Sequence, residues 1–360
     1  MSELGRLIAR RIALTGPISI ADFMAEALGH PRLGYYRTAL PLGASGDFTT
    51  APEISQMFGE LLGAWLAERW QAMGEPRPVH LVELGPGRGT LMADALRATR
   101  AIAGFHDAID LHLVEINQQM RALQRAALAQ ATPTWHARLE DVPPGPTLLI
   151  ANEFFDALPV RQFEKTPRGW IERMVGLAAD GETLRLALAP GLTPYAGLLP
   201  DAPAGAQAEF SEAGRALAAT IGRRLRRDGG WALIVDYGHD RGGLGASLQA
   251  VRGHRGAGIL ERPGESDLSA HVDFTALAEA TAMPTFGPVG QGDFLRRLGI
   301  MQRAETLKRR ADAAERHAID AALARLIAPD QMGTLFRVMA VGDDRSAAPV
   351  GFSDTPSDTT

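Results

Sequence analysis

A glycine-rich loop between a short apolar segment and a helical one constrains this chain more than any other feature. The segment 79–84 is apolar and of strand length, and Gly85, Gly87 and Gly89 follow it at intervals of two residues, just before a helical pattern that begins at Thr90. Glycines let the backbone approach a ligand with no side chain between them. In open α/β sheets, ligands bind at the carboxyl ends of strands, where such a loop lies.

Apolar runs and helical patterns alternate along the chain after this loop. The runs cover residues 79–84, 111–116, 148–151 and 231–236, and the helical patterns cover residues 90–100, 118–130 and 209–227. This alternation predicts an α/β fold with a doubly wound parallel sheet. Residues 160–188 instead offer three alternating segments separated by turns, which predict antiparallel strands inserted into the α/β core.

Further helices are predicted on both sides of this core. Residues 3–29 predict two helices broken at Thr15-Gly-Pro17. Residues 54–73 carry apolar side chains at helical spacing and predict a helix with a broad apolar face. Towards the end of the chain we expect a helix across 305–326 and a last strand at 335–341.

The composition excludes several kinds of site and partner. The 360 residues include no cysteine, so the chain forms no disulfide, iron–sulfur cluster, thiolate zinc site or cysteine nucleophile. Its nine histidines are scattered and no metal site is predicted. The net charge of −5 argues against nucleic acid as the main partner. The apolar runs are much shorter than the ~20 residues of a membrane-spanning helix, so no membrane span is expected.

The spacing of the glycines selects the kind of ligand. A dinucleotide-binding loop has its third glycine three residues after the second, and Thr90 stands at that place. A phosphate-binding loop ends in Gly-Lys-Ser/Thr, which is absent here. The pattern Glu-x-Gly-x-Gly-x-Gly from Glu83 to Gly89 resembles the first motif of class I S-adenosylmethionine-dependent methyltransferases. That resemblance implies S-adenosyl-L-methionine as the cofactor, with Glu83 meeting its positively charged amino-acid end. A dehydrogenase is the weakest rival.

Three further carboxylates are candidates for binding this cofactor. Glu115 ends the next predicted strand, where a carboxylate can accept hydrogen bonds from both ribose hydroxyl groups. Alone, Glu115 would be an ordinary solvated glutamate at a strand end. Glu140 and Asp141 follow the third predicted strand, where methyltransferases of this class often hold the adenine. Carboxylates in loops are common, so this signal is weak by itself.

Several ordered motifs resemble one family, the MidA-like methyltransferases. These motifs are Gly46-Asp-Phe-Thr-Thr-Ala-Pro-Glu53, Glu83-Leu-Gly-Pro-Gly-Arg-Gly-Thr90, Asn152-Glu-Phe-Phe-Asp-Ala-Leu-Pro159, Asp236-Tyr-Gly238, Asp267-Leu-Ser-Ala-His-Val-Asp-Phe274 and Gly287-Pro-Val-Gly-Gln-Gly-Asp-Phe294. The resemblance covers about residues 15–342. The family includes the mitochondrial complex I assembly methyltransferase that modifies an arginine. In the family picture Asp47 and Thr49 belong to a lid over the cofactor, whereas without it they are turn residues.

The residues after the fourth core strand are the main candidates for the substrate site. Asn152 is assigned to the cofactor, and Glu153 and Asp156 to catalysis, because two carboxylates can hold a guanidinium by paired hydrogen bonds. The alternative is that Asn152 and Asp156 cap the following turn. His271 is a candidate general base, since the unperturbed pKa of histidine is ~6.5. The alternative for His271 is a satisfied histidine at a helix start.

These observations define a domain map and a function. We expect an N-terminal helical cap and lid at 1–75, a Rossmann-like class I methyltransferase domain at 76–342 with an insertion at about 160–228, and a disordered tail at 343–360. The expected function is protein arginine N-methylation linked to the assembly of a respiratory-type complex, in the cytoplasm. Small-molecule methylation and a cofactor-binding assembly chaperone are the alternatives. The oligomeric state stays open, with a homodimer among the options.

Overall fold

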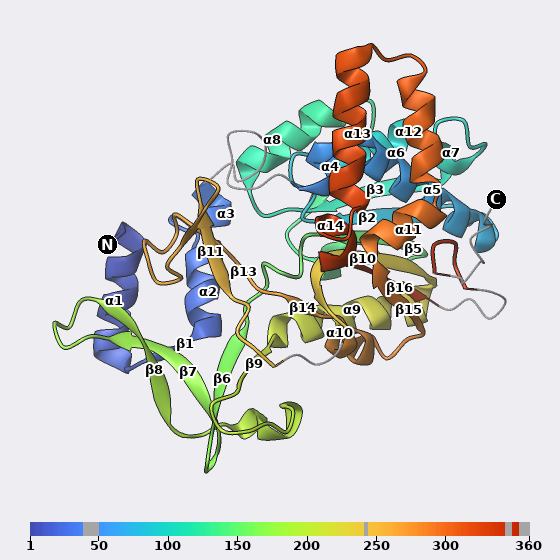
Figure 1. Cartoon of the computed structure of the whole chain (residues 1–360). Helices are drawn as coiled ribbons and strands as arrows, with labels where there is room; N and C mark the ends of the chain where they lie inside the picture. The colour runs from blue at the N-terminus through green and yellow to red at the C-terminus, as the bar shows by residue number, and fades with distance from the viewer. Residues whose placement is uncertain (39–49, 241–243, 343–347, 353–360) are drawn as a thin grey trace. The chain divides into compact units, whose positions relative to one another are not determined.

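The computed structural model describes residues 1–38, 50–240, 244–342 and 348–352, which divide into two compact units (Figure 1). Unit 1 comprises residues 1–48, 155–218 and 239–277, and unit 2 comprises residues 49–154, 219–238 and 278–360. The chain passes between the units at five places, and two of these lie within helices, α9 (Glu212–Asp228) and α10 (Phe274–Thr281).

Unit 2 is built on the predicted doubly wound sheet. Its strands follow the order β15-β16-β10-β5-β2-β3-β4. They are β2 (Val79–Leu84), β3 (Ile109–Val114), β4 (Thr134–His136), β5 (Thr147–Asn152), β10 (Gly230–His239), β15 (Thr285–Gly290) and β16 (Phe336–Gly342). Strands β4, β3, β2, β5 and β10 pair in parallel, whereas β16 runs antiparallel to β10 and β15. Every residue of β2 and β5 is buried, as expected for central strands covered on both faces.

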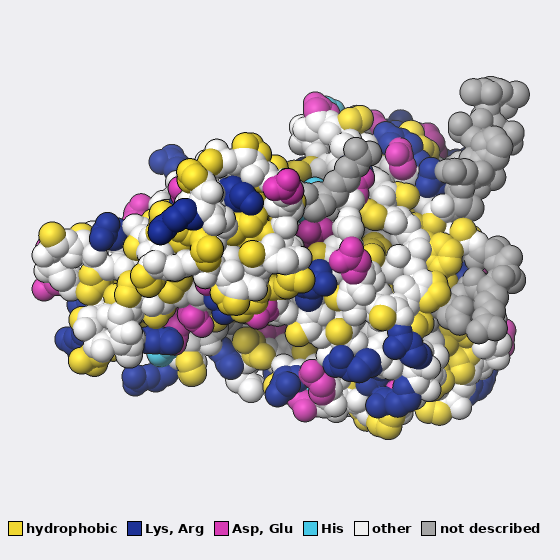
Figure 2. Space-filling model, turned by 90° about the horizontal axis from the view of Figure 1, so that it is seen from below, with side chains coloured by type: hydrophobic (Ala, Val, Ile, Leu, Met, Phe, Trp, Pro, Cys, Tyr) yellow, Lys and Arg dark blue, Asp and Glu magenta, His cyan; other side chains and the backbone are white. Residues whose placement is uncertain are grey.

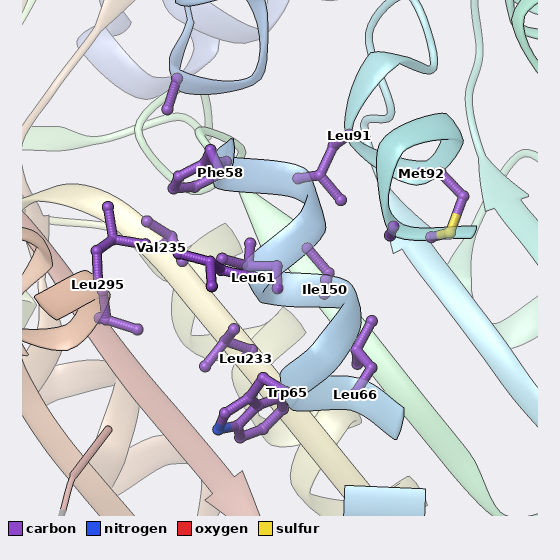
Figure 3. Close-up of a cluster of buried hydrophobic side chains, with 14 of the residues drawn as sticks. Phe58, Leu61, Trp65, Leu66, Leu91, Met92, Ile150, Leu233, Val235 and Leu295 are labelled. Atoms are coloured by element: carbon purple, nitrogen blue, oxygen red, sulfur yellow. The ribbon is translucent and has the colours of Figure 1, made fainter. Parts of the chain in front are cut away.

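Helices of unit 2 cover this sheet. They are α4 (Ala51–Ile54), α5 (Gln56–Ala72), α6 (Thr90–Ala98), α7 (Phe105–Ala108), α8 (Gln118–Ala127), α11 (Gln291–Arg297), α12 (Ile300–Lys308), α13 (Ala313–Ile327) and α14 (Met332–Leu335), with a 3-10 turn, η1, at Leu139–Asp141. Figure 3 shows α5 placing Phe58, Leu61 and Trp65 against side chains of β5 and β10, including Ile150 and Leu233. The main apolar core of unit 2 therefore lies between α5 and the sheet.

Unit 1 combines N-terminal helices with the inserted strands. Its elements are α1 (Glu3–Thr15), β1 (Ile18–Ser19), α2 (Ile20–Gly29), α3 (Tyr35–Thr38), β6 (Arg161–Thr166), β7 (Gly169–Leu177), β8 (Leu184–Leu192), η2 (Pro194–Leu198), β9 (Gln207–Phe210), β11 (Gln249–Arg252), β12 (Arg255–Ala257), β13 (Asp267–Ser269) and β14 (Val272–Asp273). The three predicted inserted segments are β6, β7 and β8, and they form an antiparallel sheet with β1 and β9, in the order β1-β7-β6-β9 with β8 beside β7. A second small sheet has the order β12-β11-β13.

The domain boundary predicted at residue 75 is not where the structure divides the chain. Residues 1–48 belong to unit 1 with most of the insertion, whereas α5 belongs to unit 2. The reason is the apolar face of α5, which packs into the core of the parallel sheet. Residues 239–277, predicted as part of the methyltransferase domain, also belong to unit 1.

Two predicted segments differ from the structure near the C-terminus. The helix expected across 305–326 is two helices, α12 and α13, because Asp312 and Glu315 form a capping box that starts α13. The tail predicted as disordered from 343 contains an ordered part at 348–352. There Phe352 packs on Phe294 with ring centroids 5.2 Å apart, and Trp65 Nε1 donates to the Val350 carbonyl at 3.1 Å.

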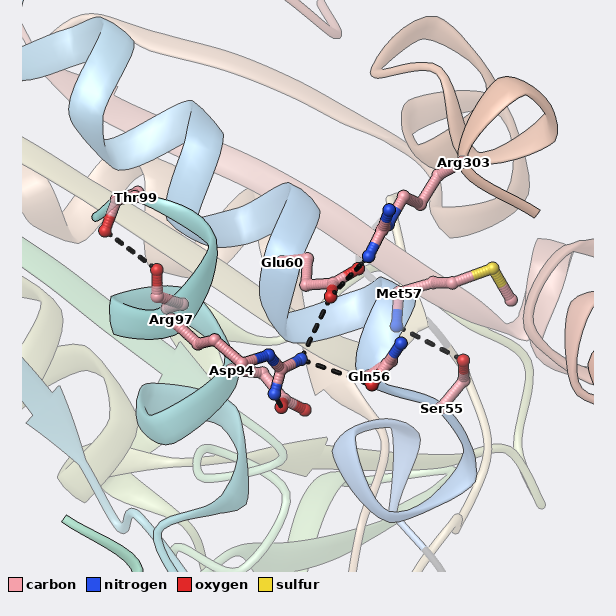
Figure 4. A network of polar contacts seen from close by, with 9 residues as sticks. Ser55, Gln56, Met57, Glu60, Asp94, Arg97, Thr99 and Arg303 are labelled. Atoms are coloured by element: carbon pink, nitrogen blue, oxygen red, sulfur yellow. Dashed lines mark hydrogen bonds and ion pairs between the residues drawn. The ribbon is translucent and has the colours of Figure 1, made fainter. Parts of the chain in front are cut away.

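A polar network joins α5, α6 and α12 of unit 2 (Figure 4). Glu60 on α5 is 6% exposed and accepts hydrogen bonds from Arg97 at 2.9 Å and from Arg303 at 2.7 and 2.9 Å. Arg97 also donates to Asp94 at 2.6 Å, while burial, the largest effect, raises the pKa of Asp94 to about 6. The carboxylate of Glu60 is thereby paired and the three helices are connected.

Charged side chains of both signs are interspersed on the face drawn in Figure 2. The arginines of the run at 223–227, at the end of α9, are not all solvated. Arg224 is 6% exposed and donates to Thr147 Oγ1 at 2.8 Å and to the Val142 carbonyl at 3.0 Å.

No helix in the described parts of the chain is both long and apolar enough to cross a membrane.

Candidate active site

The glycine loop connects β2 to α6 at the carboxyl edge of the sheet. Gly85, Gly87 and Gly89 have φ angles of 60°, 53° and 86°, a region that side chains other than glycine rarely adopt. A Cβ atom at Gly85 would lie 2.6 Å from Cδ2 of Phe154, so this position also lacks space for a side chain. Gly89 caps the N-terminus of α6, where the free backbone N–H groups favour a negatively charged ligand group.

Glu83 is a buried carboxyl group at this edge. It lies on β2, is 3% exposed, and its burial raises its pKa to about 8. Its Oε2 atom is buried and has no hydrogen-bond partner among the residues that the structure describes. A buried carboxyl oxygen without a donor is costly unless a ligand supplies one.

Glu115 follows directly after β3, and hydrogen bonds from neighbouring residues fix its carboxylate. Oε1 accepts a hydrogen bond from the backbone N–H of Asn117 at 2.7 Å, and Oε2 accepts one from Gln124 at 3.2 Å. Burial raises the pKa of Glu115, while these hydrogen bonds oppose that effect. The carboxylate is therefore oriented rather than freely rotating, as binding of a ribose diol requires.

Gln124 on α8 is a residue of this site that the sequence analysis did not identify. It is fully buried, and its side-chain amide donates to the Gly87 carbonyl at 2.7 Å as well as to Glu115. Its oxygen accepts a hydrogen bond from Trp135 Nε1 at 2.8 Å. Gln124 thus joins the glycine loop to the end of β3. Its only sequence signal was a polar side chain on the buried face of a helix.

Asn152 and Glu153 stand at the end of β5, next to β2 in the sheet. Asn152 is 9% exposed, and its Oδ1 atom has no partner in the described part of the chain. Glu153 has φ 49°, an unusual conformation outside glycine that is often found at functional sites. Its Oε1 accepts hydrogen bonds from the backbone N–H of Ala51 at 3.0 Å and from Asn152 Nδ2 at 3.3 Å. The carboxylate of Glu153 is thereby held in one orientation.

Asp236 on β10 supports the segment that follows Glu153. It is fully buried and accepts hydrogen bonds from the backbone N–H groups of Phe154 at 3.1 Å and of Tyr237 at 2.9 Å. Because the ring of Phe154 lies beside Gly85, Asp236 helps to position a wall of the glycine loop. The motif at 236–238 therefore contains a positioning residue whose role could not be assigned from the sequence.

Four other residues were predicted to bind the cofactor, and only two of them lie in the described part of the chain. Glu140 and Asp141 lie in η1 and are exposed. Glu140 pairs with Arg138 at 3.6 Å, and Asp141 accepts from the backbone N–H of Arg138 at 3.1 Å. This hydrogen bond and this ion pair do not test binding of the adenine, so that assignment remains a prediction. Asp47 and Thr49 lie outside the described residues.

Asp156 and His271 belong to unit 1. The hydroxyl of Tyr36 donates to Asp267 at 2.8 Å, and the pKa of Tyr36 is raised well above its ordinary value by burial first and then by the charges of Asp267 and Asp156. The ring of His271 is half-buried, and burial with the nearby His239 lowers its pKa. Tyr36 was not predicted from the sequence, and it brings a phenol into this group of carboxylates.

The edge residues of unit 2 fit S-adenosyl-L-methionine chemically. Glu83 and Asn152 present buried oxygen atoms that lack donors in the described structure, and the ammonium group of the amino-acid end of the cofactor is such a donor. Glu115 presents a held carboxylate for hydroxyl groups, and the glycine loop lets the backbone approach. The strand order of unit 2 and this edge together define a class I S-adenosylmethionine-dependent methyltransferase.

Comparison with known proteins leads to the family. Residues 61–289 match the model of a family described as "Putative S-adenosyl-L-methionine-dependent methyltransferase". The chain belongs to this family, and its cofactor is S-adenosyl-L-methionine.

Named relatives and a solved structure agree with this membership. The mitochondrial protein arginine methyltransferase NDUFAF7 of Danio rerio is 37% identical, over 93% of this chain and 85% of that protein. The human protein of the same name is 35% identical, over 93% of this chain and 82% of that protein. A crystal structure from Burkholderia thailandensis with S-adenosyl-homocysteine bound matches with a TM-score of 0.85 and 28% identity, over 98% of this chain and 94% of that one.

Proposed function

We propose that this methyltransferase transfers a methyl group to a nitrogen of an arginine side chain in a protein substrate. The observation that carries the proposal is the similarity along almost the whole chain to proteins named as protein arginine methyltransferases. We further propose that the substrate is a subunit of a respiratory-type complex, as the resemblance to the MidA-like family implies.

The proposed cofactor site uses the residues at the carboxyl edge of unit 2. Glu83 and Asn152 receive the amino-acid end, the loop of Gly85, Gly87 and Gly89 passes beneath it, and Glu115 accepts the ribose hydroxyl hydrogens. When bound, S-adenosyl-L-methionine supplies an electrophilic methyl group on its sulfonium. The protein then has to align the acceptor nitrogen with that methyl and remove a proton. Roles for Asp47, Thr49, Glu140 and Asp141 at this cofactor remain part of the proposal.

Glu153 and Asp156 are the proposed holders of the guanidinium. They lie three positions apart in the chain, and the carboxylate of Glu153 is already held by Ala51 and Asn152. Two carboxylates hold a guanidinium by charge-assisted hydrogen bonds and limit the directions in which its nitrogens point.

His271 is the proposed proton acceptor. Burial lowers its pKa, so the ring is neutral near pH 7 and has a nitrogen lone pair available. A neutral imidazole can remove the proton that the methylated nitrogen must lose.

The compartment and assembly state belong to the same proposal. A cytoplasmic location remains a prediction. The relatives named above are instead described as mitochondrial. A homodimer likewise remains a prediction.

Labelling of methyl acceptors tests the proposed function. Purified protein and S-adenosyl-L-methionine with a labelled methyl group are added to an extract from cells that lack the protein, and mass spectrometry locates the label. We expect a methylated arginine in a protein, and no label with Gly87→Val, which also loses cofactor binding in calorimetry. Label in a small molecule, or on another residue type, would refute arginine methylation.

A second comparison separates catalysis from a chaperone role. Asp156→Asn is expected to bind the cofactor like the wild type while losing arginine methylation at least about tenfold, because one of two charged holders is removed. In cells, the variant should fail to replace the wild type. Full replacement by a variant without methylation would favour the assembly chaperone.

A further inference from the structure

Three side chains that can bind a metal converge at the amino end of β2 and β3, the edge opposite the glycine loop. His80 is the second residue of β2 and is paired in register with Asp110, the second residue of β3. His112 lies two residues further along β3. Nδ1 of His80 lies 3.0 Å from Nε2 of His112. Oδ2 of Asp110 lies 3.1 Å from Nε2 of His112 and 3.5 Å from Nδ1 of His80.

The other ring nitrogens of both histidines have partners. Nε2 of His80 lies 3.2 Å from the Pro144 carbonyl, which can only accept a hydrogen bond. His80 Nε2 therefore carries the proton, and Nδ1 turns a lone pair towards the cluster. Nδ1 of His112 lies 2.9 Å from Nε2 of His136. Histidines that bind metals usually donate their second ring N–H to such a carbonyl or acceptor.

Proton counting leaves the cluster electron-rich. With His112 protonated at Nδ1, all three converging atoms are electron-pair donors without a proton among them. With His112 protonated at Nε2, one proton serves two acceptors, Asp110 Oδ2 and His80 Nδ1. A bound cation would satisfy all three atoms at once.

The separations fit a single ion. Metal–ligand distances of about 2.1 Å combined with separations of 3.0, 3.1 and 3.5 Å give angles of roughly 90° to 115° at the ion. Such angles suit three ligands on one face of a four- to six-coordinate ion. We propose that His80, His112 and Asp110 form a binding site for a divalent transition-metal ion such as Zn²⁺, with solvent completing its coordination.

This site is reachable and separate from the methyl-transfer chemistry. The side chain of Asp110 is 48% exposed, which gives the ion a path from solvent, whereas His80 and His112 are buried. The ligands come from two adjacent strands, so an ion would cross-link β2 and β3 and stabilise the folded state. No metal site is predicted from spacing along the chain, because His80 is distant from the other two ligands in the sequence. Strand pairing brings together residues 30 and 32 positions apart.

Cobalt binding tests the proposal directly. Untagged full-length protein is treated with a chelator and titrated with Co²⁺, whose visible absorption reports its ligands. We expect one Co²⁺ per chain with absorption bands of a site containing nitrogen ligands, displacement of the Co²⁺ by Zn²⁺, and a rise in Tm of at least about 3 °C with excess Zn²⁺.

Asp110→Asn is the decisive variant, because its side chain is exposed at the strand edge and the substitution preserves shape. We expect it to weaken Co²⁺ binding at least about tenfold. Asp107→Asn, an exposed carboxylate on α7, is the matched control and should bind like the wild type. If the wild type and Asp110→Asn bind Co²⁺ equally, or if neither binds it, the site does not exist and the histidines form a neutral hydrogen-bonded chain. Neither result depends on methyl transfer.

Discussion

The buried carboxyl group of Glu83 makes the pH dependence of cofactor binding calculable. Its pKa of about 8 lies one unit above pH 7, so roughly nine-tenths of the molecules carry a proton on Glu83 at that pH. The proposed contact with the ammonium group of the ligand requires the ionised form. Ionising Glu83 at pH 7 therefore costs free energy, on the order of 1 kcal/mol.

Binding should therefore release protons. At pH 7 we expect most of one proton to be released for each ligand bound, and the association constant should fall by up to roughly tenfold from pH 7 to pH 6. Glu83→Gln removes the ionisable group, so it should abolish both the proton release and this slope. At pH 8 the variant should bind roughly 10- to 100-fold more weakly, since a hydrogen bond to a charged group contributes about 1.5–3 kcal/mol.

Calorimetry with S-adenosyl-homocysteine measures these quantities without turnover. Titrations in two buffers of different ionisation enthalpy give the protons released, and repeating them at pH 6, 7 and 8 gives the slope. Glu305→Gln, which changes an exposed carboxylate on α12, is the matched control and should behave as the wild type does. A wild type that releases no proton, or a Glu83→Gln variant that still releases one, would refute this assignment.

The same group predicts a pH effect on the free protein. Because the folded-state pKa of Glu83 is raised from 4.5 to about 8, its contribution to stability is fully present below about pH 4.5 and is lost as the pH rises through 8. Between these limits the free energy of unfolding of the wild type should fall by up to about 5 kcal/mol relative to Glu83→Gln. Denaturant unfolding at several pH values measures the difference, and parallel pH profiles would contradict it.

Three further substitutions test the packing and polar contacts of unit 2. Gly85→Ala should lower the free energy of unfolding by at least about 1–2 kcal/mol, because the φ angle of Gly85 is positive and Phe154 blocks the Cβ. It should also weaken S-adenosyl-homocysteine binding in calorimetry. Gly74→Ala is the control, since φ is also positive there but space is open, and it should leave binding unchanged. Gln124→Leu should destabilise the fold by about 2 kcal/mol in denaturant unfolding, because the Gly87 carbonyl and Glu115 lose their hydrogen-bond donor. It should also weaken S-adenosyl-homocysteine binding several-fold. Unchanged affinity would exclude a positioning role for Gln124. Glu60→Gln should lower the free energy of unfolding by about 1–3 kcal/mol, because two partly exposed arginines lose a buried carboxylate. High salt should reduce this loss. Thermal unfolding at two salt concentrations checks this, and a loss that does not depend on salt would contradict it.

Local patterns predicted most of the core elements. Strand β2 has the predicted bounds, β3 and β5 lie within two residues of theirs, and β10 lies within three, because buried parallel strands are short, continuous apolar runs. The break between α12 and α13 was missed, although Asp312 and Glu315 show the capping pattern, because apolar spacing continues on both sides of it. The order of Phe352 was missed because one aromatic residue in a polar tail gives no periodic signal.

Contacts between distant segments could not be predicted in the same way. The sequence placed α5 with the N-terminal cap, since nothing local distinguishes a helix that packs on the sheet from one that packs elsewhere. The apolar side chains of α5 fill the space over β5 and β10, and this assigns it to unit 2. The inserted strands were predicted, but their sheet with the N-terminal β1 depends on pairing across more than 150 residues.

The amino-acid sequence by itself determined the class of this protein. A glycine loop after an apolar strand, with Glu83 before it and Glu115 ending the next strand, is a local pattern whose chemistry depends on spacing along the chain. Tertiary structure alone decided how these groups are held and charged. Burial sets the pKa of Glu83, Gln124 joins Gly87 to Glu115, and strand register gathers His80, Asp110 and His112. The physical reason is that burial and side-chain contacts depend on which segments pair and pack, and one segment does not carry that information.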